Sequence, residues 1–213
     1  MALQIKEEEM YSMPTERFER LRPMKKQMIR NAVLAEFQRC SYGEIYLSKI
    51  AKGAGVSRGS LYKYFYDRND IIQFALQQTW MDVWKFDQDA LMDSGGDFWE
   101  MMKESLSWHL ERCNENPIYR LVYLQPEGVQ QKENSMGLEM ETMVDQHREW
   151  IYKHMNRMDF RIISQEEFEA LQDTCYALLF LSVQKYLVGN GTKEEIETEF
   201  AKRLDKTKAV YMN

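Results

Sequence analysis

Residues 47–71 read LSKIAKGAGVSRGSLYKYFYDRNDI, and they carry the strongest structural signal in the chain. Two short helical patterns are separated by Gly55, with Ala51 four residues before this glycine and Leu61 six residues after it. A helix-turn-helix needs a small residue where its helices cross, a turn residue that tolerates positive φ, and an apolar anchor on the second helix. This spacing therefore predicts a helix-turn-helix.

The second helix of this pattern carries side chains that suit a DNA major groove. Ser57 is a natural N-cap, because its hydroxyl can accept hydrogen bonds from free amides of the first turn. Cations attract phosphates, hydroxyl groups reach base edges, and Gly59 permits close approach. Asp67 can cap a third helix, whose first turn aims Arg68 at a phosphate. We expect DNA contacts from Ser57, Arg58, Gly59, Ser60, Tyr62, Lys63, Tyr64 and Arg68.

The run IAKGAGVSRGSLYKYF at residues 50–65, followed by YDRNDI, resembles the tetracycline-repressor-like (TetR) family of bacterial transcription regulators. The resemblance covers residues 24–76. It implies an all-α fold with an N-terminal three-helix helix-turn-helix DNA-binding domain and a C-terminal helical ligand-binding and dimerisation domain. The family usually opens the first helix of the motif with threonine or serine, and here Tyr46 stands near that place. Ser48 can substitute as the cap, or Tyr46 can itself reach a phosphate, and we add both to the expected DNA contacts.

The distribution of charge also favours one DNA-binding end. The 213-residue chain has a net charge of −6, yet residues 15–70 hold 12 Lys or Arg against 6 Asp or Glu, whereas residues 71–213 hold 15 against 25. A basic segment on an acidic body fits a protein that touches a polyanion with one end. We expect a mobile acidic segment at 1–14, the DNA-binding domain at 15–70, and the ligand-binding and dimerisation domain at 71–213.

Cysteine content and hydropathy predict a soluble cytoplasmic protein without a membrane partner. Cys40, Cys113 and Cys175 are odd in number and widely spaced, which favours a reducing compartment over a disulfide scaffold or a structural zinc site. The N-terminus lacks a secretory pattern. The longest strongly apolar stretch, 175–183, is far below the ~20 residues that span a bilayer.

Helical periodicity continues through the remaining chain, and no run is typical of a strand. We expect helices at 15–21, 23–39, 71–92, 98–114, 117–124, 137–158 and 164–188, and a last one after Thr192. Asp97 can cap one of them, and Ser164 with Glu167, and Thr192 with Glu195, have capping-box spacing. The 164–188 helix is apolar nearly all round between 175 and 187, so a second subunit is a natural cover. The resemblance implies the same homodimer, whose two DNA-binding domains would enter successive major grooves ~34–36 Å apart.

The acidic body is rich in aromatic and methionine residues. Such residues at helical spacing usually form core, yet some of them can line an adaptable apolar pocket. The resemblance implies a pocket between the long linking helix and the middle helices. Two alternatives stay open, a metal or anionic ligand at His147 and His154 and a redox role for Cys113, but we expect no metal or other cofactor. The candidate ligand contacts are Trp84, Met102, Trp108, Tyr123, Met143, His147, Trp150 and Tyr176.

These patterns favour a homodimeric repressor that binds a palindromic double-stranded DNA operator and is released by a small, largely apolar effector. An enzyme is disfavoured, because the chain has no nucleophile elbow, phosphate-binding glycine loop or metal-ligand cluster. A protein-binding adaptor, or an activator of transcription without a small-molecule inducer, is the alternative.

Overall fold

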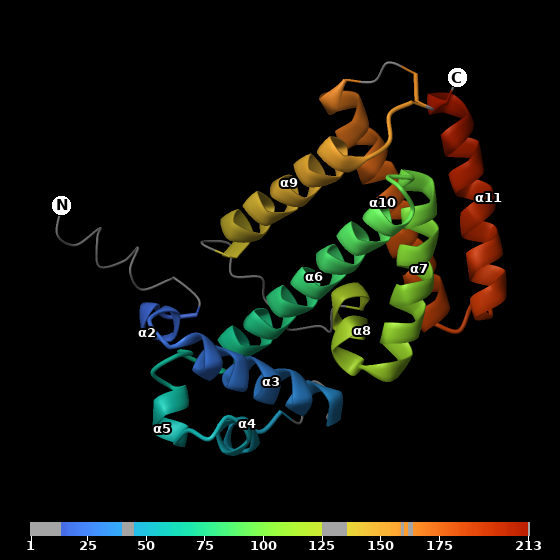
Figure 1. Cartoon of the computed structure of the whole chain (residues 1–213). Coiled ribbons are helices and arrows are strands. Elements are labelled where there is room, and N and C mark those ends of the chain that lie inside the picture. The colour runs from blue at the N-terminus through green and yellow to red at the C-terminus, as the bar shows by residue number, and fades with distance from the viewer. Residues whose placement is uncertain (1–13, 40–44, 125–135, 159, 162–163, 213) are drawn as a thin grey trace. The chain divides into compact units, whose positions relative to one another are not determined.

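The structure, a computed structural model, describes residues 14–39, 45–124, 136–158, 160–161 and 164–212 (Figure 1). In these ranges every regular element is a helix, and the only strand-like pairing is an isolated bridge between Phe160 and Met212. The all-α prediction is confirmed. The helices are α2 (Glu16–Glu19), α3 (Pro23–Arg39), α4 (Leu47–Gly53), α5 (Arg58–Leu61), α6 (Arg68–Asp93), α7 (Phe98–Glu115), α8 (Pro117–Tyr123), α9 (Met136–His154), α10 (Gln165–Leu187) and α11 (Lys193–Tyr211).

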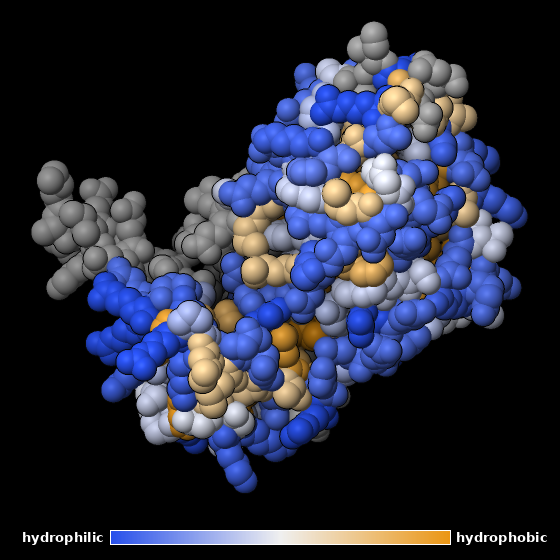
Figure 2. All heavy atoms as spheres, in the orientation of Figure 1, coloured by the Kyte–Doolittle hydropathy of each residue, from blue (hydrophilic) through white to orange (hydrophobic). Residues whose placement is uncertain are grey.

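The chain forms two compact units. The first comprises Met1–Trp80 and Asn116–Thr142, and the second comprises Met81–Glu115 and Met143–Asn213. Helix α6 runs through the division. The expected acidic segment at 1–14 lies almost wholly outside the described residues, and the boundary at residue 70 stays a prediction. On the face drawn in Figure 2, hydrophilic residues cover much of each unit, with smaller hydrophobic patches among them.

The first unit is built around a cluster of three phenylalanines. The ring of Phe18 lies 5.7 Å from that of Phe65 and 5.2 Å from that of Phe74, and all three side chains are buried. Thr15 ties the chain ahead of α2 to the end of the helix-turn-helix, because its N–H donates to Tyr64 O at 3.1 Å and its hydroxyl to Lys63 O at 2.9 Å. Helix α8 packs against α3 in the same unit.

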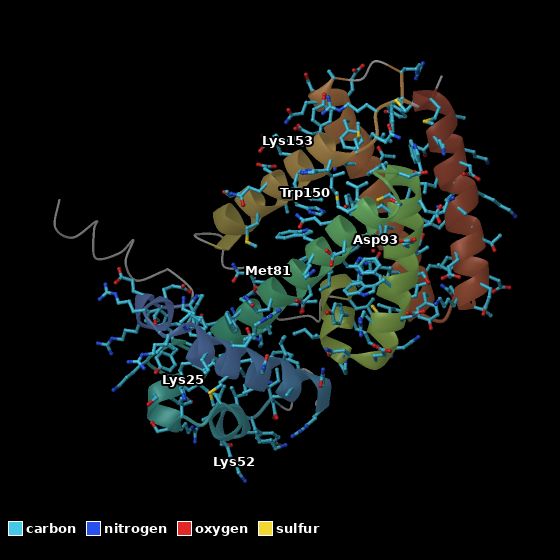
Figure 3. The ribbon with its side chains drawn as sticks, in the orientation of Figure 1. Lys25, Lys52, Met81, Asp93, Trp150 and Lys153 are labelled. Carbon is cyan, nitrogen blue, oxygen red and sulfur yellow. The ribbon has the colours of Figure 1, made fainter. Side chains whose placement is uncertain are left out.

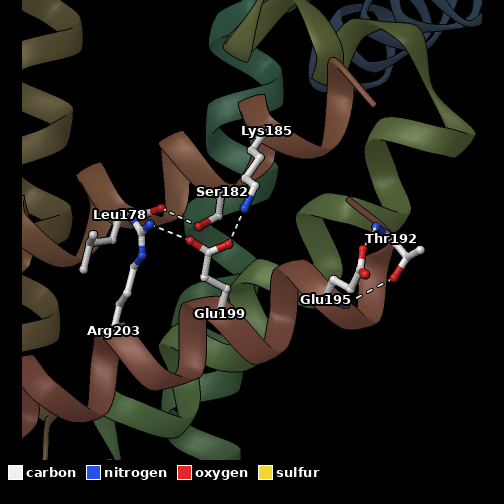
Figure 4. A network of polar contacts seen from close by, with 7 residues as sticks. All are labelled: Leu178, Ser182, Lys185, Thr192, Glu195, Glu199 and Arg203. Carbon is white, nitrogen blue, oxygen red and sulfur yellow. Dashed lines mark hydrogen bonds and ion pairs between the residues drawn. The ribbon is translucent and has the colours of Figure 1, made fainter. Parts of the chain in front are cut away.

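The second unit packs α7, α10 and α11 together. The capping-box predictions are confirmed at Ser164 with Glu167 and at Thr192 with Glu195. Glu199 on α11 accepts from Lys185 on α10 and from Arg203 one turn further along α11 (Figure 4). These charged groups are substantially exposed, so the apolar side chains of the core contribute more to stability than this network does. No helix in the described ranges is both long and apolar enough to cross a membrane.

The break between α6 and α7 is held by polar backbone contacts. Asp97 caps α7 as expected, accepting from the N–H groups of Trp99 at 2.8 Å and Glu100 at 3.1 Å. The carbonyl of Gly96 accepts from Asn156 N–H at 2.8 Å, directly after α9. Helix α9 ends at His154, four residues before the expected end, where the chain turns to make this contact.

Candidate nucleic-acid interface and effector site

Helices α4 and α5 cross as the sequence pattern requires. Gly55 takes a φ of +60° in the turn, a left-handed conformation that favours glycine. Ala51 and Leu61 are both buried. A Cβ at Gly53 would lie only 3.2 Å from Cβ of Ala32 on α3, so this crossing also depends on a residue without a side chain.

Three polar contacts fix the starts of α5 and α6. Ser57 Oγ accepts from Ser60 N–H at 3.0 Å, which confirms the expected N-cap. At the start of α6, Asp67 accepts from Asp70 N–H at 2.9 Å, while Asp70 accepts from Tyr66 N–H at 2.8 Å. Asp67 therefore caps α6 as predicted, and Asp70 holds the residue before the cap, a contact that the sequence pattern did not predict.

The start of α4 is held by a residue that sequence reasoning missed. Neither Tyr46 nor Ser48 caps this helix with its side chain. Instead, the buried carboxylate of Glu36 on α3 accepts from Tyr46 N–H at 3.1 Å, and the Lys49 ammonium lies 3.9 Å from the same carboxylate. A charged residue on the apolar face of α3 was the available signal. This hydrogen bond holds the backbone of Tyr46 and leaves its ring exposed.

The predicted DNA contacts lie at the start of α4, on and just after α5, and at the start of α6. Tyr46 and Tyr62 expose 53% and 45% of their surfaces, although large aromatic residues are usually buried. The Arg58 guanidinium carbon lies 5.9 Å from the centre of the Tyr62 ring. The remaining set divides by exposure: Ser48, Ser57, Arg58, Gly59 and Lys63 are exposed, and Ser60, Tyr64 and Arg68 are half-buried.

Two further lysines belong to this surface. The Lys49 ammonium stands 4.7 Å from the centre of the Tyr46 ring, so it adds a cation beside an exposed phenol. Lys25, in the basic first turn of α3, instead donates to the carbonyls of Ala54 at 3.0 Å and Gly55 at 3.1 Å (Figure 3). Its ammonium thus braces the turn of the motif.

Comparison with known proteins agrees with this geometry. Residues 29–73 match the family model described as bacterial regulatory proteins, tetR family. The N-terminal segment of the chain is therefore similar to the DNA-binding domain of the tetR family. A tetR-family transcriptional regulator from Streptomyces coelicolor is 17% identical, with 89% of this chain and 82% of that chain covered and a TM-score of 0.61.

Two more solved structures share the TetR-family fold at 15% identity. The match to a TetR transcriptional regulator from Rhodococcus sp. RHA1 covers 86% of this chain and 94% of that chain, with a TM-score of 0.60. The match to RolR in complex with resorcinol covers 89% of this chain and 87% of the RolR chain, with a TM-score of 0.58. At this identity the likeness concerns the fold alone.

The structure brings together three of the predicted effector contacts, all in the second unit. The rings of Trp84 and His147 are stacked with centroids 5.6 Å apart, and the rings of His147 and Tyr176 lie 6.2 Å apart. Asp87, which sequence reasoning missed, accepts from the Tyr176 hydroxyl at 2.8 Å, and its carboxylate lies 3.4 Å from His147 Nε2. We call Asp87, His147 and Tyr176 the Asp87 cluster.

The other predicted effector contacts have separate surroundings. Trp108 stacks on Phe86 with ring centroids 4.9 Å apart, and Trp150 stacks on His154 at 4.0 Å. Met102 is fully buried and Met143 is half-buried. Tyr123 is buried in the first unit, whereas the other seven predicted contacts belong to the second. The described contacts therefore single out Trp84, His147 and Tyr176 from the predicted set.

The metal and redox alternatives gain no support from the described residues. No group of three or more possible metal-binding side chains occurs among them, and His154 is exposed while His147 is buried. Cys113, the candidate redox residue, is fully buried, and so is Cys175, whose pKa burial raises to about 12. A thiol with so high a pKa is a poor nucleophile at neutral pH. Cys40 lies outside the described residues.

His109 makes the stability of the second unit dependent on pH. Burial lowers its pKa from 6.5 to about 4, partly opposed by the charge of Asp87. Because the unfolded chain binds the proton first, stability should fall as the pH falls from about 6.5 to about 4, by roughly 3 kcal/mol for this group. Urea unfolding at several pH values should show this loss in the wild type and a smaller one in His109→Gln. His154→Gln, at an exposed histidine, should retain the full loss, and equal pH dependence in all three proteins would contradict the assignment.

Proposed function

We propose that the chain is a homodimeric repressor that binds a palindromic DNA operator through the major groove and is released by a small, largely apolar ligand. The observation that carries the DNA-binding part is the exposed surface of α5, where Arg58, Tyr62 and Lys63 project beside Gly59. Cations and phenols on a short exposed helix are suited to phosphates and base edges.

An apolar face on α10 supports the homodimer. Leu181 is 55% exposed and Val188, just after the helix, is 59% exposed. With the half-buried Leu178, these side chains recur at intervals of three and seven residues on one side of the helix. An apolar stripe of this kind is suited to a second copy of the chain. A two-fold dimer would present two α5 helices to successive major grooves.

Ligand release is supported by the Asp87 cluster and by one similar protein. RolR shares this fold and binds resorcinol, a small aromatic molecule, in its structure. In this chain the stacked Trp84 and His147 rings would suit a ligand of similar size. Binding would release the operator only through a difference in affinity for the DNA-bound and free states of the repressor.

Replacing Arg58 or Arg68 with alanine should weaken operator binding. The operator would first be selected from random duplexes with the wild-type protein, and two half-sites one helical turn apart are expected. Arg68→Ala should lower affinity for all sequences and reduce the salt slope by about one, because it removes a phosphate contact. Arg58→Ala should cost about 1–3 kcal/mol and relax base preference if it reads a base. Gel shifts at several salt concentrations measure both effects.

Arg203→Ala is the matched control, since it removes an exposed arginine from α11, outside the helix-turn-helix. It should bind the operator as the wild type does. Unchanged affinity in both Arg58→Ala and Arg68→Ala would contradict the proposed interface. The adaptor alternative predicts weak duplex binding with no steep salt dependence. An activator would bind the operator in the same way and differ only in the direction of its effect on transcription.

A further inference from the structure

We propose that the Asp87 cluster binds the hydroxyl group of an uncharged aromatic ligand. This inference deepens the proposed function, because it names the chemistry of the effector and the atoms that recognise it. It rests on three helices of the second unit that bring together Asp87 from α6, His147 from α9 and Tyr176 from α10.

The hydrogen bonds within the cluster have one consistent arrangement. Burial and the Asp87 carboxylate raise the pKa of Tyr176 well above its usual value, so the phenol keeps its proton and donates a hydrogen bond to Asp87 Oδ2. The phenol oxygen then accepts from His147 Nε2, which lies 3.1 Å away. In a neutral imidazole, this arrangement places the ring proton of His147 on Nε2. Its Nδ1 therefore carries a lone pair that can accept a hydrogen bond.

Two acceptors of the cluster have no partner within the described protein. They are Asp87 Oδ1, on a fully buried residue, and His147 Nδ1, on a residue that is only 5% exposed. Buried polar atoms are almost always hydrogen-bonded, because an unsatisfied one destabilises the folded protein. A group that donates to either atom would relieve part of this destabilisation. The cluster therefore favours a ligand that brings a hydrogen-bond donor.

Gln172 adds a second polar side chain on the same side of α10. It lies one helical turn before Tyr176, is fully buried, and has no partner in the described protein for either its amide nitrogen or its amide oxygen. An amide can both donate and accept. A hydroxyl group is matched to this set, because it can donate to a carboxylate or imidazole and accept from an amide.

Charge and shape narrow the ligand further. The Asp87 carboxylate would repel an anion, and a buried cation would lose its hydration, which makes a neutral donor the better match. The Trp84 ring, stacked on His147 at an interplanar angle of 24°, provides an aromatic surface beside the polar atoms. An aromatic ring carrying a hydroxyl satisfies both features.

The first test compares four probes of similar size on the full-length chain: phenol, toluene, benzoate and benzylamine. Binding is measured from the change in tryptophan fluorescence and from the shift in melting temperature. Phenol should bind most tightly, by about tenfold or more over toluene, because toluene leaves the buried acceptors unpaired. The inference is overturned if benzoate, benzylamine or toluene binds as well as phenol, or if none of the four binds. Absence of binding would mean that buried water satisfies these atoms.

Asp87→Asn then tests the atoms themselves. The amide is isosteric with the carboxylate but uncharged, so the ratio of phenol affinity to benzoate affinity should fall by about tenfold or more. The matched control is Asp89→Asn, an exposed carboxylate on the same helix that pairs with Lys85, and its ratio should stay unchanged. If Asp87→Asn is too unstable to measure, Tyr176→Phe removes the hydroxyl that positions Asp87 and should also lower the ratio. Equal ratios in the wild type and the measurable variant would overturn the inference.

Operator release separates this inference from the proposed function. If phenol binds through Asp87 but does not weaken operator binding, the hydroxyl site stands and ligand-controlled repression fails. If the operator is instead released by an anionic compound that binds equally well to Asp87→Asn, the proposed function stands and the hydroxyl site fails.

Discussion

Gly96→Ala should destabilise the chain by on the order of 4 kcal/mol. Gly96 has a φ of +87°, and a Cβ there would lie 2.7 Å from Asn156 N and 3.0 Å from His154 O. Both neighbours are backbone atoms at the end of α9, so no side-chain rotation can relieve the contact. The substitution would also disturb the hydrogen bond from Asn156 N–H to Gly96 O. Backbone strain, steric overlap and a weakened hydrogen bond therefore act together.

Urea unfolding monitored by circular dichroism measures this loss. Gly95→Ala is the matched control, because Gly95 has a φ of +69° but a Cβ added there would meet no atom within 4 Å. It should cost only about 1–2 kcal/mol, the penalty of a left-handed conformation. Similar losses in the two variants would show that conformation alone, and not the approach of α9, makes glycine necessary at residue 96.

The same turn illustrates how far local sequence can reach. The two glycines and Asp97 predicted a helix break and a cap, and the structure has both. The partner of Gly96 lies about 60 residues away in the chain, and no local pattern encodes that contact. The sequence therefore predicted where the break occurs but not which of the two glycines is sterically required.

The DNA-binding helices could be predicted in more detail because their determinants are nearly all local. Ser57 caps the helix that it begins, and Gly55 adopts its positive φ within the turn itself. The contacts that the sequence did not predict come from α3. Glu36 and Lys25 each hold a backbone group of the motif, yet a charged side chain on an amphipathic helix is usually solvated.

The effector site was the least predictable part. His147 and Tyr176 were among the candidates, but Asp87 was missed among several acidic residues of α6. A signal was present, since Asp87 follows Val83 by four residues and precedes Ala90 and Leu91 by three and four, which places it within an apolar stripe. All three of those apolar residues are buried, as is Asp87. Aspartate inside a helical apolar stripe indicates a buried carboxylate that needs partners.

Gly59→Ala should abolish most operator binding while leaving the fold intact. A Cβ at Gly59 would meet only Ser57 Oγ, at an ordinary contact distance of 3.9 Å. Alanine also favours a helix over glycine by roughly 1 kcal/mol, so the free energy of unfolding should stay the same or rise slightly. We therefore expect the stability and the DNA affinity of this variant to change in opposite directions.

The loss of affinity follows from the close approach that we propose for α5. If Gly59 faces the groove floor, an added methyl group displaces the helix, and neighbouring side chains lose their contacts to bases. Each good contact of this kind contributes about 1–3 kcal/mol. Two such contacts amount to roughly 4 kcal/mol, or about a thousandfold in affinity. Gel shifts with the selected operator measure the loss, and Gly59→Leu should increase it. If both variants fold and retain wild-type affinity, α5 does not enter the groove with this face, and the DNA contacts must come from the flanking exposed tyrosines and lysines.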